Sequence, residues 1–502
     1  MEMKIYGRHR EKLLLDRLLA SPNAEFIALW GRRRIGKTYL IDNGLCSKAD
    51  LCMTVTGQKD QNQKRQLDLL RQALARAFFN GADLPLLHSW DDAFKAIIAA
   101  VKNNASHSKN IVIFLDELPW LAGRTGKLVA ALDHAWNTEL KNISNLRLVI
   151  CGSAASWFVK KIVRDRGGLH NRLTCKMRLN PFSLSDVEEY LTGNGISMNR
   201  VQIVELYLAL GGVPFYLNFV QKGESPQQAI SRILFADGPL ANEFNDLFHA
   251  LFDDGEAHLK LVKVLSTKRR GLLRSDIIKI TKFNGGYLTK KLDELSEAGF
   301  IGASHPYKGK KDAILYRIID PFLLFHLKWI ESSPPGVLNQ VDKNIWYKYR
   351  QTPSYEAWAG YSFENICYLH LHAIAKFLGL DHVLFTSGTW EYRSQPVPRN
   401  KKFGRKLNPP PMSEDIRGAQ IDLLFDREDQ VISLCEIKYC ENPFVITKDY
   451  AEVLERKRNI FKKITKSNKV LHLVIIATHG VTDNEYSRKL IQRVVSLDDL
   501  WS

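Results

Sequence analysis

A glycine-rich segment near the start of the chain constrains the fold more than any other feature. It follows an apolar run at residues 26–30, which predicts a short buried strand, and it precedes a helical pattern. Its letters, GRRRIGKT, have the GxxxxGK[ST] spacing in the required order of strand, loop and helix. Glycines let backbone N–H groups face phosphate oxygens, and the helix adds the positive end of its dipole. The sequence therefore predicts a nucleotide-binding loop made of Gly31, Arg32, Arg33, Arg34, Ile35, Gly36, Lys37 and Thr38.

Acidic residues follow a second apolar run, residues 110–115, at the position where an α/β sheet places ligand chemistry. We expect Lys37 to reach the β- and γ-phosphates of ATP, and Thr38 and Asp116 to hold Mg²⁺. Glu117 would polarise the attacking water. The alternative is that the Asp-Glu pair only caps a helix, and the glycine loop favours the catalytic interpretation. A third expected strand, residues 146–152, leads to Ser153, our candidate for sensing the γ-phosphate.

Further motifs complete a resemblance that covers roughly the first half of the chain. They are Tyr6-Gly-Arg8 with Glu11, GRRRIGKT, FLDEL, CGSAAS, Asn171-Arg172-Leu173, Asn180-Pro-Phe-Ser-Leu and Gly211-Gly-Val-Pro214. This set resembles the prokaryotic AAA+-type ATPases, and more narrowly the branch near the STAND switch ATPases and the archaeal-type origin-recognition ATPases. The resemblance implies that Arg172 is an arginine finger or γ-phosphate sensor, with Arg164 and Arg166 as rival candidates. It also implies that residues 211–214 belong to a helical lid over the nucleotide.

Between residues 256 and 320, the sequence contains three amphipathic helical patterns followed by two strand-like runs. This order predicts a winged helix-turn-helix. Its recognition helix would carry Tyr287, Thr289, Lys290 and Lys291, and its wing would carry Lys308 to Lys311. Such a module binds DNA in many proteins and serves only as a packing element in others, and both interpretations stay open here.

Two strand-like runs near the end, residues 419–426 and 431–440, predict a hairpin with charges on one face. Side chains in a strand alternate, so Glu436 and Lys438 project from the same side, and Asp422 of the neighbouring strand can face them. Two carboxylates beside a lysine suit Mg²⁺ or Mn²⁺. The metal would activate water, and Lys438 would orient that water or stabilise the anion.

This D…ExK arrangement resembles the PD-(D/E)xK nuclease superfamily, although no proline precedes Asp422. The resemblance implies that Glu364, on a preceding helix, is a further metal ligand, and that Asp422, Glu436 and Lys438 are catalytic. The competing interpretation is an ion pair on an exposed strand. Domains of this kind also persist as inactive binding modules, so cleavage is a question separate from the fold.

The whole sequence therefore predicts an α/β protein with four parts. They are a P-loop AAA+-type ATPase core with a parallel sheet (1–180), a helical lid (181–250), a winged helix (251–330) and a restriction-endonuclease-like, PD-(D/E)xK domain (340–502). The expected cofactors are ATP and Mg²⁺, with Mn²⁺ as an option at the nuclease-like site.

The formal net charge of +17 over 502 residues favours a polyanionic partner. We expect this partner to be nucleic acid, with DNA as the first candidate. Basic clusters occur at residues 268–271, 308–311, 398–406 and 455–466. No apolar run approaches the roughly 20 residues that span a bilayer, and seven scattered cysteines predict reduced thiols in a cytoplasmic protein. An arginine finger acting in trans would require a homo-oligomer, whereas a switch ATPase can be a monomer.

Three functions are compatible with these features. The first is an ATPase that gates a metal-dependent nuclease acting on nucleic acid. The second is a STAND-like regulatory ATPase whose terminal domain binds DNA or protein without cleaving. The third, a transcriptional regulator that uses the winged helix, leaves the C-terminal acids unexplained.

Overall fold

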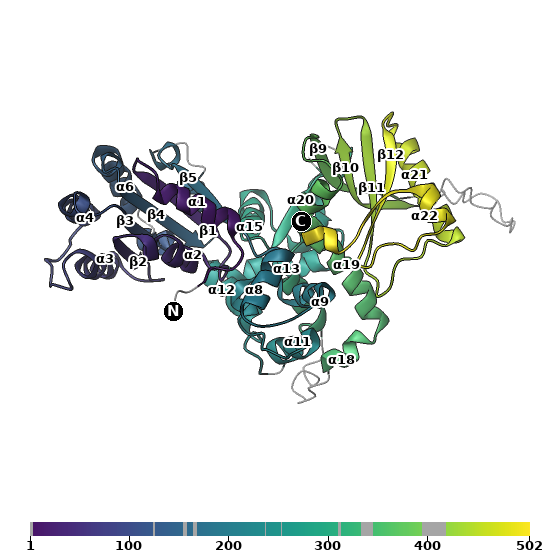
Figure 1. Cartoon of the computed structure of the whole chain (residues 1–502), viewed down its shortest axis with the longest axis horizontal. Helices are drawn as coiled ribbons and strands as arrows, with labels where there is room; N and C mark the ends of the chain where they lie inside the picture. Colours follow the sequence, from purple (N-terminus) through teal and green to yellow (C-terminus); the bar gives the residue numbers. More distant parts are fainter. Residues whose placement is uncertain are drawn as a thin grey trace.

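The computed structural model describes residues 4–123, 126–153, 158–163, 168–235, 237–252, 254–309, 313–332, 345–393 and 418–501. The molecule is elongated, with one sheet at each end and helices between them (Figure 1). The basic run 398–406, Lys310, Lys311, Arg164 and Arg166 lie outside the described residues, as does most of the expected linker after Glu331. No helix within the described ranges has the length and apolar character needed to cross a membrane.

The first sheet contains five parallel strands in the order β2-β3-β4-β1-β5. Parallel strands require crossover connections, and helices on both faces supply them. Alternate side chains of β1 point to opposite faces. Ile27 and Leu29 pack toward α1 and α2, while Phe26 and Ala28 pack toward α3, α4 and α6. The strands are β1 (Glu25–Gly31), β2 (Leu51–Thr56), β3 (Ile111–Asp116), β4 (Leu146–Ser153) and β5 (Cys175–Leu179).

Within the described residues, six α-helices accompany this sheet, and side-chain caps start two of them. Ser89 accepts a hydrogen bond from the Asp92 backbone N–H at the start of α4, and Asn62 does the same for α3. These side-chain caps define the residues at which the two helices begin. The helices are α1 (His9–Leu19), α2 (Lys37–Gly44), α3 (Gln63–Phe78), α4 (Trp90–Ala105), α5 (Leu118–Ala122) and α6 (Lys127–Thr138).

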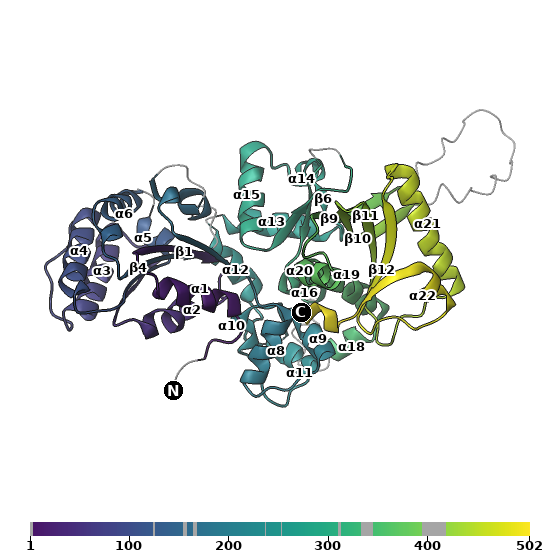
Figure 2. The ribbon, with the colours of Figure 1, turned by 45° about the horizontal axis from the view of Figure 1, so that its top comes forward.

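The middle of the molecule is helical apart from one small sheet (Figure 2). Its first group of helices is α8 (Leu184–Gly193), α9 (Arg200–Leu210), α10 (Pro214–Leu217), α11 (Pro226–Leu234) and α12 (Glu243–Leu251). Three helices follow, and antiparallel strands in the order β6-β8-β7 pack beside them. These elements are α13 (Gly255–Ser266), β6 (Leu272–Leu273), α14 (Arg274–Thr281), α15 (Gly285–Glu297), β7 (Ile301–Ser304) and β8 (Leu315–Ile318).

The second large sheet is mixed and has the order β13-β12-β11-β10-β9. β11 pairs antiparallel with β10 and parallel with β12. Helices α19 and α21 pack on β11 and β10. The elements of this part are α16 (Pro321–Trp329), α18 (Ile345–Arg350), α19 (Pro353–Leu369), α20 (Leu371–Phe377), β9 (Phe385–Tyr392), β10 (Ala419–Arg427), β11 (Val431–Lys438), α21 (Lys448–Thr465), β12 (Val470–Ala477), α22 (Glu485–Leu490) and β13 (Ile491–Val495).

One apolar core extends through three of the expected parts. It joins side chains of the helices after β5, such as Phe182 and Leu206, to those of the following helices and to one face of the second sheet, such as Cys435 and Ile437. The other face of that sheet has its own core with α21. The segments 181–250, 251–330 and 340–502 are therefore packed as one continuous body.

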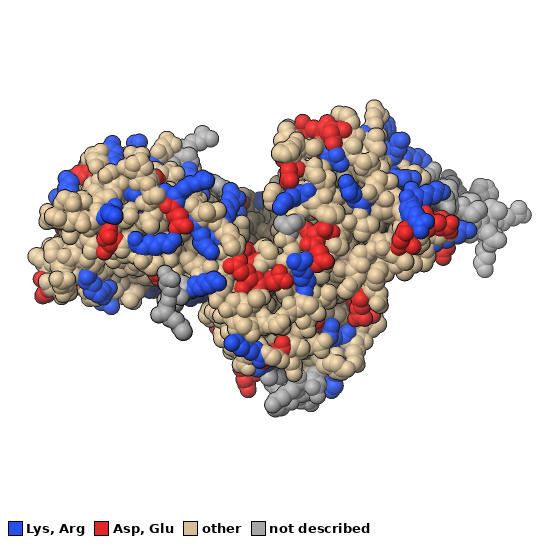
Figure 3. All heavy atoms as spheres, in the orientation of Figure 1, with Lys and Arg blue, Asp and Glu red and all other residues tan. Residues whose placement is uncertain are grey.

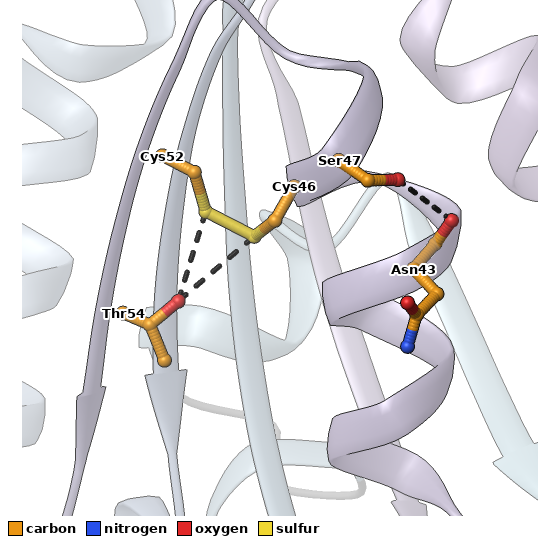
Figure 4. Close-up of a disulfide and its surroundings, with 5 residues drawn as sticks. All are labelled: Asn43, Cys46, Ser47, Cys52 and Thr54. Carbon is orange, nitrogen blue, oxygen red and sulfur yellow. Dashed lines mark hydrogen bonds between the residues drawn. A yellow bond between two sulfur atoms is a disulfide. The ribbon is translucent and has the colours of Figure 1, made fainter. Parts of the chain in front are cut away.

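The expectation that all seven cysteines are reduced is wrong for one pair. The sulfurs of Cys46 and Cys52 are 2.13 Å apart and form a disulfide (Figure 4). The turn after α2 brings Cys46 beside β2, with a Cα–Cα distance of 5.3 Å that falls in the range a disulfide requires. The remaining cysteines, Cys151, Cys175, Cys367, Cys435 and Cys440, are free.

Candidate functional site

The nucleotide loop connects β1 to α2 at the carboxyl edge of the first sheet. Gly31 lies so close to β5 that a Cβ there would be 2.3 Å from the Leu179 carbonyl oxygen. Gly36 has a φ of 84°, in the left-handed region that glycine favours. Lys37 is buried, and its ammonium donates to the carbonyl oxygens of Gly31 (3.3 Å) and Arg32 (3.0 Å). The loop thus folds around the Lys37 cation.

The residues expected to hold Mg²⁺ lie together. The Thr38 hydroxyl donates to a carboxylate oxygen of Asp116 at 2.9 Å, and Asp116 is almost fully buried. A hydroxyl and a carboxylate are the oxygen ligands that Mg²⁺ prefers. The donor set therefore fits a magnesium ion bound with the nucleotide phosphates.

Glu117 and Ser153 form a direct contact. Glu117 has a φ of 47°, and its carboxylate accepts hydrogen bonds from the hydroxyl of Ser153 and, at 3.2 Å, from the Ser153 backbone N–H. Glu117 also faces the nucleotide cavity. Ser153, expected to sense the γ-phosphate, thus holds the carboxylate expected to polarise water.

The cavity beside the loop has a volume of about 680 Å³. Its other walls come from the N-terminal segment and from the helices after β5, which the sequence interpretation expected to form a lid over the nucleotide; it had not assigned individual side chains of either to the site. Tyr6 and Tyr190 meet edge to face, with ring centroids 5.8 Å apart. Aromatic rings beside a phosphate loop suit a nucleotide base. The walls away from the loop include Tyr6, Arg8, Phe182, Tyr190, Asn194, Phe215 and Asn218.

Arg172 lies near the amino-terminal ends of the parallel strands, whereas the nucleotide loop lies at their carboxyl ends. It precedes β5, where the Thr174 backbone N–H donates to Phe26 and Cys175 is level with Ile27. The loop begins after Gly31, so about 13 Å of strand separates the two edges. Arg172 is exposed and does not line the cavity. It is therefore not brought to the nucleotide site of its own chain.

Two loop arginines form ion pairs with residues that are far away in the sequence. Arg32 forms a fully buried ion pair with Asp320, which caps α16, and also donates to the Tyr216 hydroxyl at 3.3 Å. Arg34 pairs with Glu243 of α12. Of the three loop arginines, Arg33 and Arg34 line the cavity and Arg32 does not. The nucleotide loop is thereby tied to elements about two hundred residues or more away in sequence.

The C-terminal acids lie on the second sheet as the strand alternation predicts. The carboxylate of Glu436 is buried and accepts hydrogen bonds from Lys438 (3.0 Å), Tyr450 (2.6 Å) and Lys457 (2.6 Å). On the neighbouring strand, a carboxylate oxygen of Asp422 accepts from the Ile437 backbone N–H at 3.1 Å. Tyr450 and Lys457, both on α21, are additions to the site that the sequence interpretation missed.

The protonation of these acids is coupled. Burial and the charge of Asp422 raise the pKa of Glu364 to about 8, and burial and the charge of Glu436 raise the pKa of Asp422 to about 6. Burial also opposes ionisation of Glu436, but Lys457 and Lys438 lower its pKa below the ordinary value. Glu364 thus shares one electrostatic site with the two strand acids, although it lies on α19.

This acid site is closed on its interior side, whereas the side chain of Lys438 is 28% exposed. The cavity beside Glu436 and Lys457 has a volume of about 10 Å³. Among the described residues, no three histidine, cysteine or carboxylate side chains converge as a ready-made metal site. The donor set nevertheless suits a hard cation, because carboxylates that raise one another's pKa are stabilised by a positive charge between them.

The small sheet in the middle contacts the C-terminal sheet. The backbone N–H of Tyr307 donates to Thr389 of β9 at 3.0 Å, and the ammonium of Lys308 donates to the Thr465 carbonyl at 2.7 Å. On α15, Tyr287 and Lys291 both contact Asp254. Lys290 is 57% exposed, and Thr289 contacts Arg274. Of the lysines expected at the wing tip, Lys308 thus donates to a backbone carbonyl of α21.

Comparison with known proteins identifies the first part of the chain. Residues 6–220 match the family model described as an ATPase domain predominantly from Archaea. This part of the chain is a P-loop ATPase domain, and such domains use a nucleotide, usually with Mg²⁺.

Similar proteins extend over more of the chain. An uncharacterized protein of Methanocaldococcus jannaschii is 23% identical over 397 residues, which covers 78% of this chain and 82% of the relative. A solved Walker-type ATPase of Pyrococcus abyssi is 17% identical, covering 64% of this chain and 96% of its own, with a TM-score of 0.42. The ORC2 protein of Aeropyrum pernix is 15% identical, covering 70% of this chain and 97% of its own, with a TM-score of 0.40.

Proposed function

We propose that this chain is an ATP-dependent nuclease, in which the ATPase domain controls metal-dependent cleavage of nucleic acid by the C-terminal domain 340–502. DNA is the first candidate for the substrate. The observation that carries the proposal is the coupled acid site. Glu364, Asp422 and Glu436 influence one another's protonation, and Lys438 contacts Glu436. An isolated ion pair on an exposed strand would involve neither the second strand nor α19.

In this proposal, Asp422, Glu436 and Glu364 hold Mg²⁺ or Mn²⁺, which when bound would lower the pKa of water and offset the charge of the phosphate. Lys438 orients the attacking water or stabilises the developing anion. Tyr450 fixes the orientation of Glu436 through its 2.6 Å hydrogen bond. Lys457 keeps Glu436 ionised, so that this carboxylate stays available as a ligand.

At the other end, Lys37 binds the β- and γ-phosphates, Thr38 and Asp116 hold Mg²⁺, and Glu117 polarises the attacking water. Ser153 positions Glu117. Arg172 acts as an arginine finger on the nucleotide of a neighbouring copy. It lies at the end of the strands away from the nucleotide loop, so it does not reach the nucleotide bound to its own chain. This role requires a homo-oligomer.

The two sites communicate through the loop arginines. Binding of a nucleotide rearranges the loop that carries Arg32 and Arg34, and their partners Asp320 and Glu243 belong to the body that contains the acid site. Residues 251–330 act as a winged helix in this proposal. Lys290 and Thr289 on α15 would contact DNA, while the wing contacts β9 and α21.

A cleavage assay tests the proposal. The protein is incubated with labelled DNA or RNA, ATP and Mg²⁺ or Mn²⁺, beside Lys438→Ala and a matched control, Lys489→Ala, which changes an exposed lysine of α22. We expect cleavage by the wild type and the control and none by Lys438→Ala. Cleavage by Lys438→Ala at the wild-type rate, or no cleavage by any of them, would contradict the proposal.

A second function is favoured by one specific observation. Glu436 already has three hydrogen-bond donors, and the cavity beside it is about 10 Å³. A site filled in this way suits a STAND-like regulatory ATPase whose terminal domain binds DNA or protein without cleaving it. Binding of DNA with the same affinity by the wild type and Lys438→Ala, without cleavage by either, would support this function.

A further inference from the structure

The small middle sheet lies beside β9 (Figure 2). A second cavity, of about 680 Å³, lies where the two meet. We call it the wing–β9 cleft. Its walls are the segment after β7, the end of β8, the end of α19 and the middle of β9. Three basic side chains and no acidic one face it, and several hydroxyl groups do as well. The polar side chains used below are His305, Lys308, Arg317, Tyr368, Thr386 and Ser387.

Arg317 is the unusual member of this group. Its side chain is only 8% exposed, yet it forms no hydrogen bond or ion pair with another described residue. One face of its guanidinium lies 3.6 Å from the ring centroid of Tyr368. That contact uses the face of the guanidinium and leaves its N–H donors, which lie in the plane, free to face the cleft that Arg317 lines. A cation held in this way can donate to an anion that enters the cleft.

The chemistry of the cleft selects the kind of anion. A planar guanidinium with several N–H donors matches the geometry of a phosphate group. Thr386 and Ser387 of β9 line the cleft as well, and because their side chains alternate in direction, one of the two hydroxyls supplies a neutral donor; Lys308 and His305 add basic groups. The volume equals that of the cavity at the nucleotide loop, so a whole nucleotide fits.

The cleft adjoins the acid site. Tyr368 follows Glu364 by four residues on α19, so the two side chains lie on the same face of the helix. The Tyr368 hydroxyl donates to the Asp422 carbonyl oxygen at 2.7 Å, and Arg317 is close enough to Glu364 to affect its charge. A phosphate on Arg317 would therefore lie one side chain away from the proposed metal ligands.

We propose that the wing–β9 cleft binds a phosphate of a nucleotide, supplied by a nucleic-acid strand or by a free nucleotide, with Arg317 as its main ligand. As a substrate site, the cleft rests on the proposed nuclease function. As a binding site, it rests on the basic lining of the cleft, with Arg317 stacked on Tyr368 beside it, whether or not the acids cleave. The purely structural alternative is that Arg317 only joins β8 to α19 by stacking on Tyr368.

Binding without cleavage tests this inference. A fluorescently labelled, short single-stranded DNA is titrated with the full chain in EDTA, without ATP, and anisotropy is recorded. The variants are Arg317→Met, Arg317→Lys and the control Arg488→Met, which changes an exposed arginine bound to Asp483. We expect Arg317→Met to weaken binding by about tenfold or more, because a charge-assisted contact to phosphate is lost. Arg317→Lys should restore part of the affinity, and Arg488→Met should leave it unchanged.

A second variant covers the case in which Arg317→Met fails to fold. Ser387 is exposed on β9, so Ser387→Glu should fold while placing a negative charge in the cleft. It should weaken binding as well. Competition by thymidine monophosphate would assign the cleft to free nucleotides, and competition only by unlabelled oligonucleotide would assign it to a strand.

Unchanged binding of DNA, thymidine monophosphate and inorganic phosphate by the Arg317 and Ser387 variants would overturn the inference. Because no metal is present, this result is independent of cleavage. Binding that depends on Arg317 in a protein that never cleaves would leave the cleft standing and contradict only the nuclease activity.

Discussion

The two ends of the molecule contain similar groups, lysines beside carboxylates, but they differ in how much open space surrounds these groups. At the nucleotide loop, Lys37, Asp116 and Glu117 surround or adjoin a cavity of about 680 Å³, and the carboxylate of Glu117 faces open space. At the acid site, Lys438, Lys457 and Tyr450 bind Glu436 directly, and the cavity between Glu436 and Lys457 is about 10 Å³. The groups of the first site therefore line an open cavity, whereas Glu436 of the second site is paired with side chains of its own domain.

Charge on the surface follows the same division. On the face in Figure 3, lysines and arginines are spread over the ATPase end and occur again at the end that holds α21, where acids lie among them, and further acids gather in the middle. The α21 end includes the exposed Lys462 and Lys466. Because nucleic acid is attracted to basic surface, the α21 end is the side on which the proposed substrate would approach the closed site.

The largest expected effect concerns the link between the two sites. Replacing Arg32 by Met leaves Asp320 buried without its cation, and loss of one partner of a buried pair costs about 3–5 kcal/mol of stability. Urea unfolding followed by circular dichroism measures this loss. Adding Asp320→Asn to Arg32→Met should restore part of it.

The matched control for that link is Arg65→Met. Arg65 is 45% exposed and pairs with Asp68 on the surface of the same domain, so its loss should cost at most about 1 kcal/mol. An Arg32→Met protein that is as stable as Arg65→Met would show that the loop is not held to α16.

Next in size is the open site itself. Lys37→Ala removes the cation at the centre of the loop and should lower the rate of ATP hydrolysis by about 100-fold or more. Phosphate release measures the rate. Lys48→Ala, which changes an exposed lysine paired with Asp16 after the same helix, should retain the wild-type rate. Equal rates for the two variants would remove Lys37 from the mechanism.

The closed site should bind metal in competition with protons. Glu364 and Asp422 have pKa values of about 8 and about 6, and a metal binds only their ionised forms. The affinity for Mn²⁺ should therefore rise by about tenfold or more between pH 6 and pH 8. Isothermal titration calorimetry without nucleotide measures it. Asp422→Asn should abolish this binding and Asp116→Asn should not, and a flat pH profile would contradict the coupled acids.

The smallest expected effect is on stability without metal. The raised pKa of Glu364, from 4.5 to about 8, means that the folded state holds a proton that the unfolded chain has released in that window. The stability that protonated Glu364 contributes should therefore be fully present below about pH 4.5, and it should be lost as the pH rises toward 8. Glu364→Gln should raise Tm by about 2–4 °C at pH 8 and change it little at pH 5. A Tm difference that is independent of pH would show that Glu364 is ionised throughout.

The parts of this account that the sequence predicted are those in which the chemistry is local. The glycine loop, the acids after β3 and the Glu436–Lys438 pair each lie within a few residues, and strand alternation places their side chains on known faces. The parallel sheet follows from the same pattern, because apolar runs alternate with helical segments.

Contacts between distant segments could not be predicted from these patterns. Arg32 meets Asp320 across 288 residues, and Tyr6 meets Tyr190 only because the helices after β5 fold back over the loop. The helical pattern around Lys457 was visible, but which face of α21 covers Glu436 depends on tertiary packing. The place of Arg172 depends on strand order, since β5 pairs with β1 at the edge of the sheet.

The most direct test of the central claim is whether the open site controls the closed one. Cleavage of DNA is measured in Mg²⁺ with ATP, with ADP and without nucleotide, for the wild type, Lys37→Ala and the control Lys48→Ala. We expect ATP to stimulate cleavage by the wild type and by Lys48→Ala, and not to stimulate cleavage by Lys37→Ala. Cleavage that is unchanged in Lys37→Ala would contradict control by ATP.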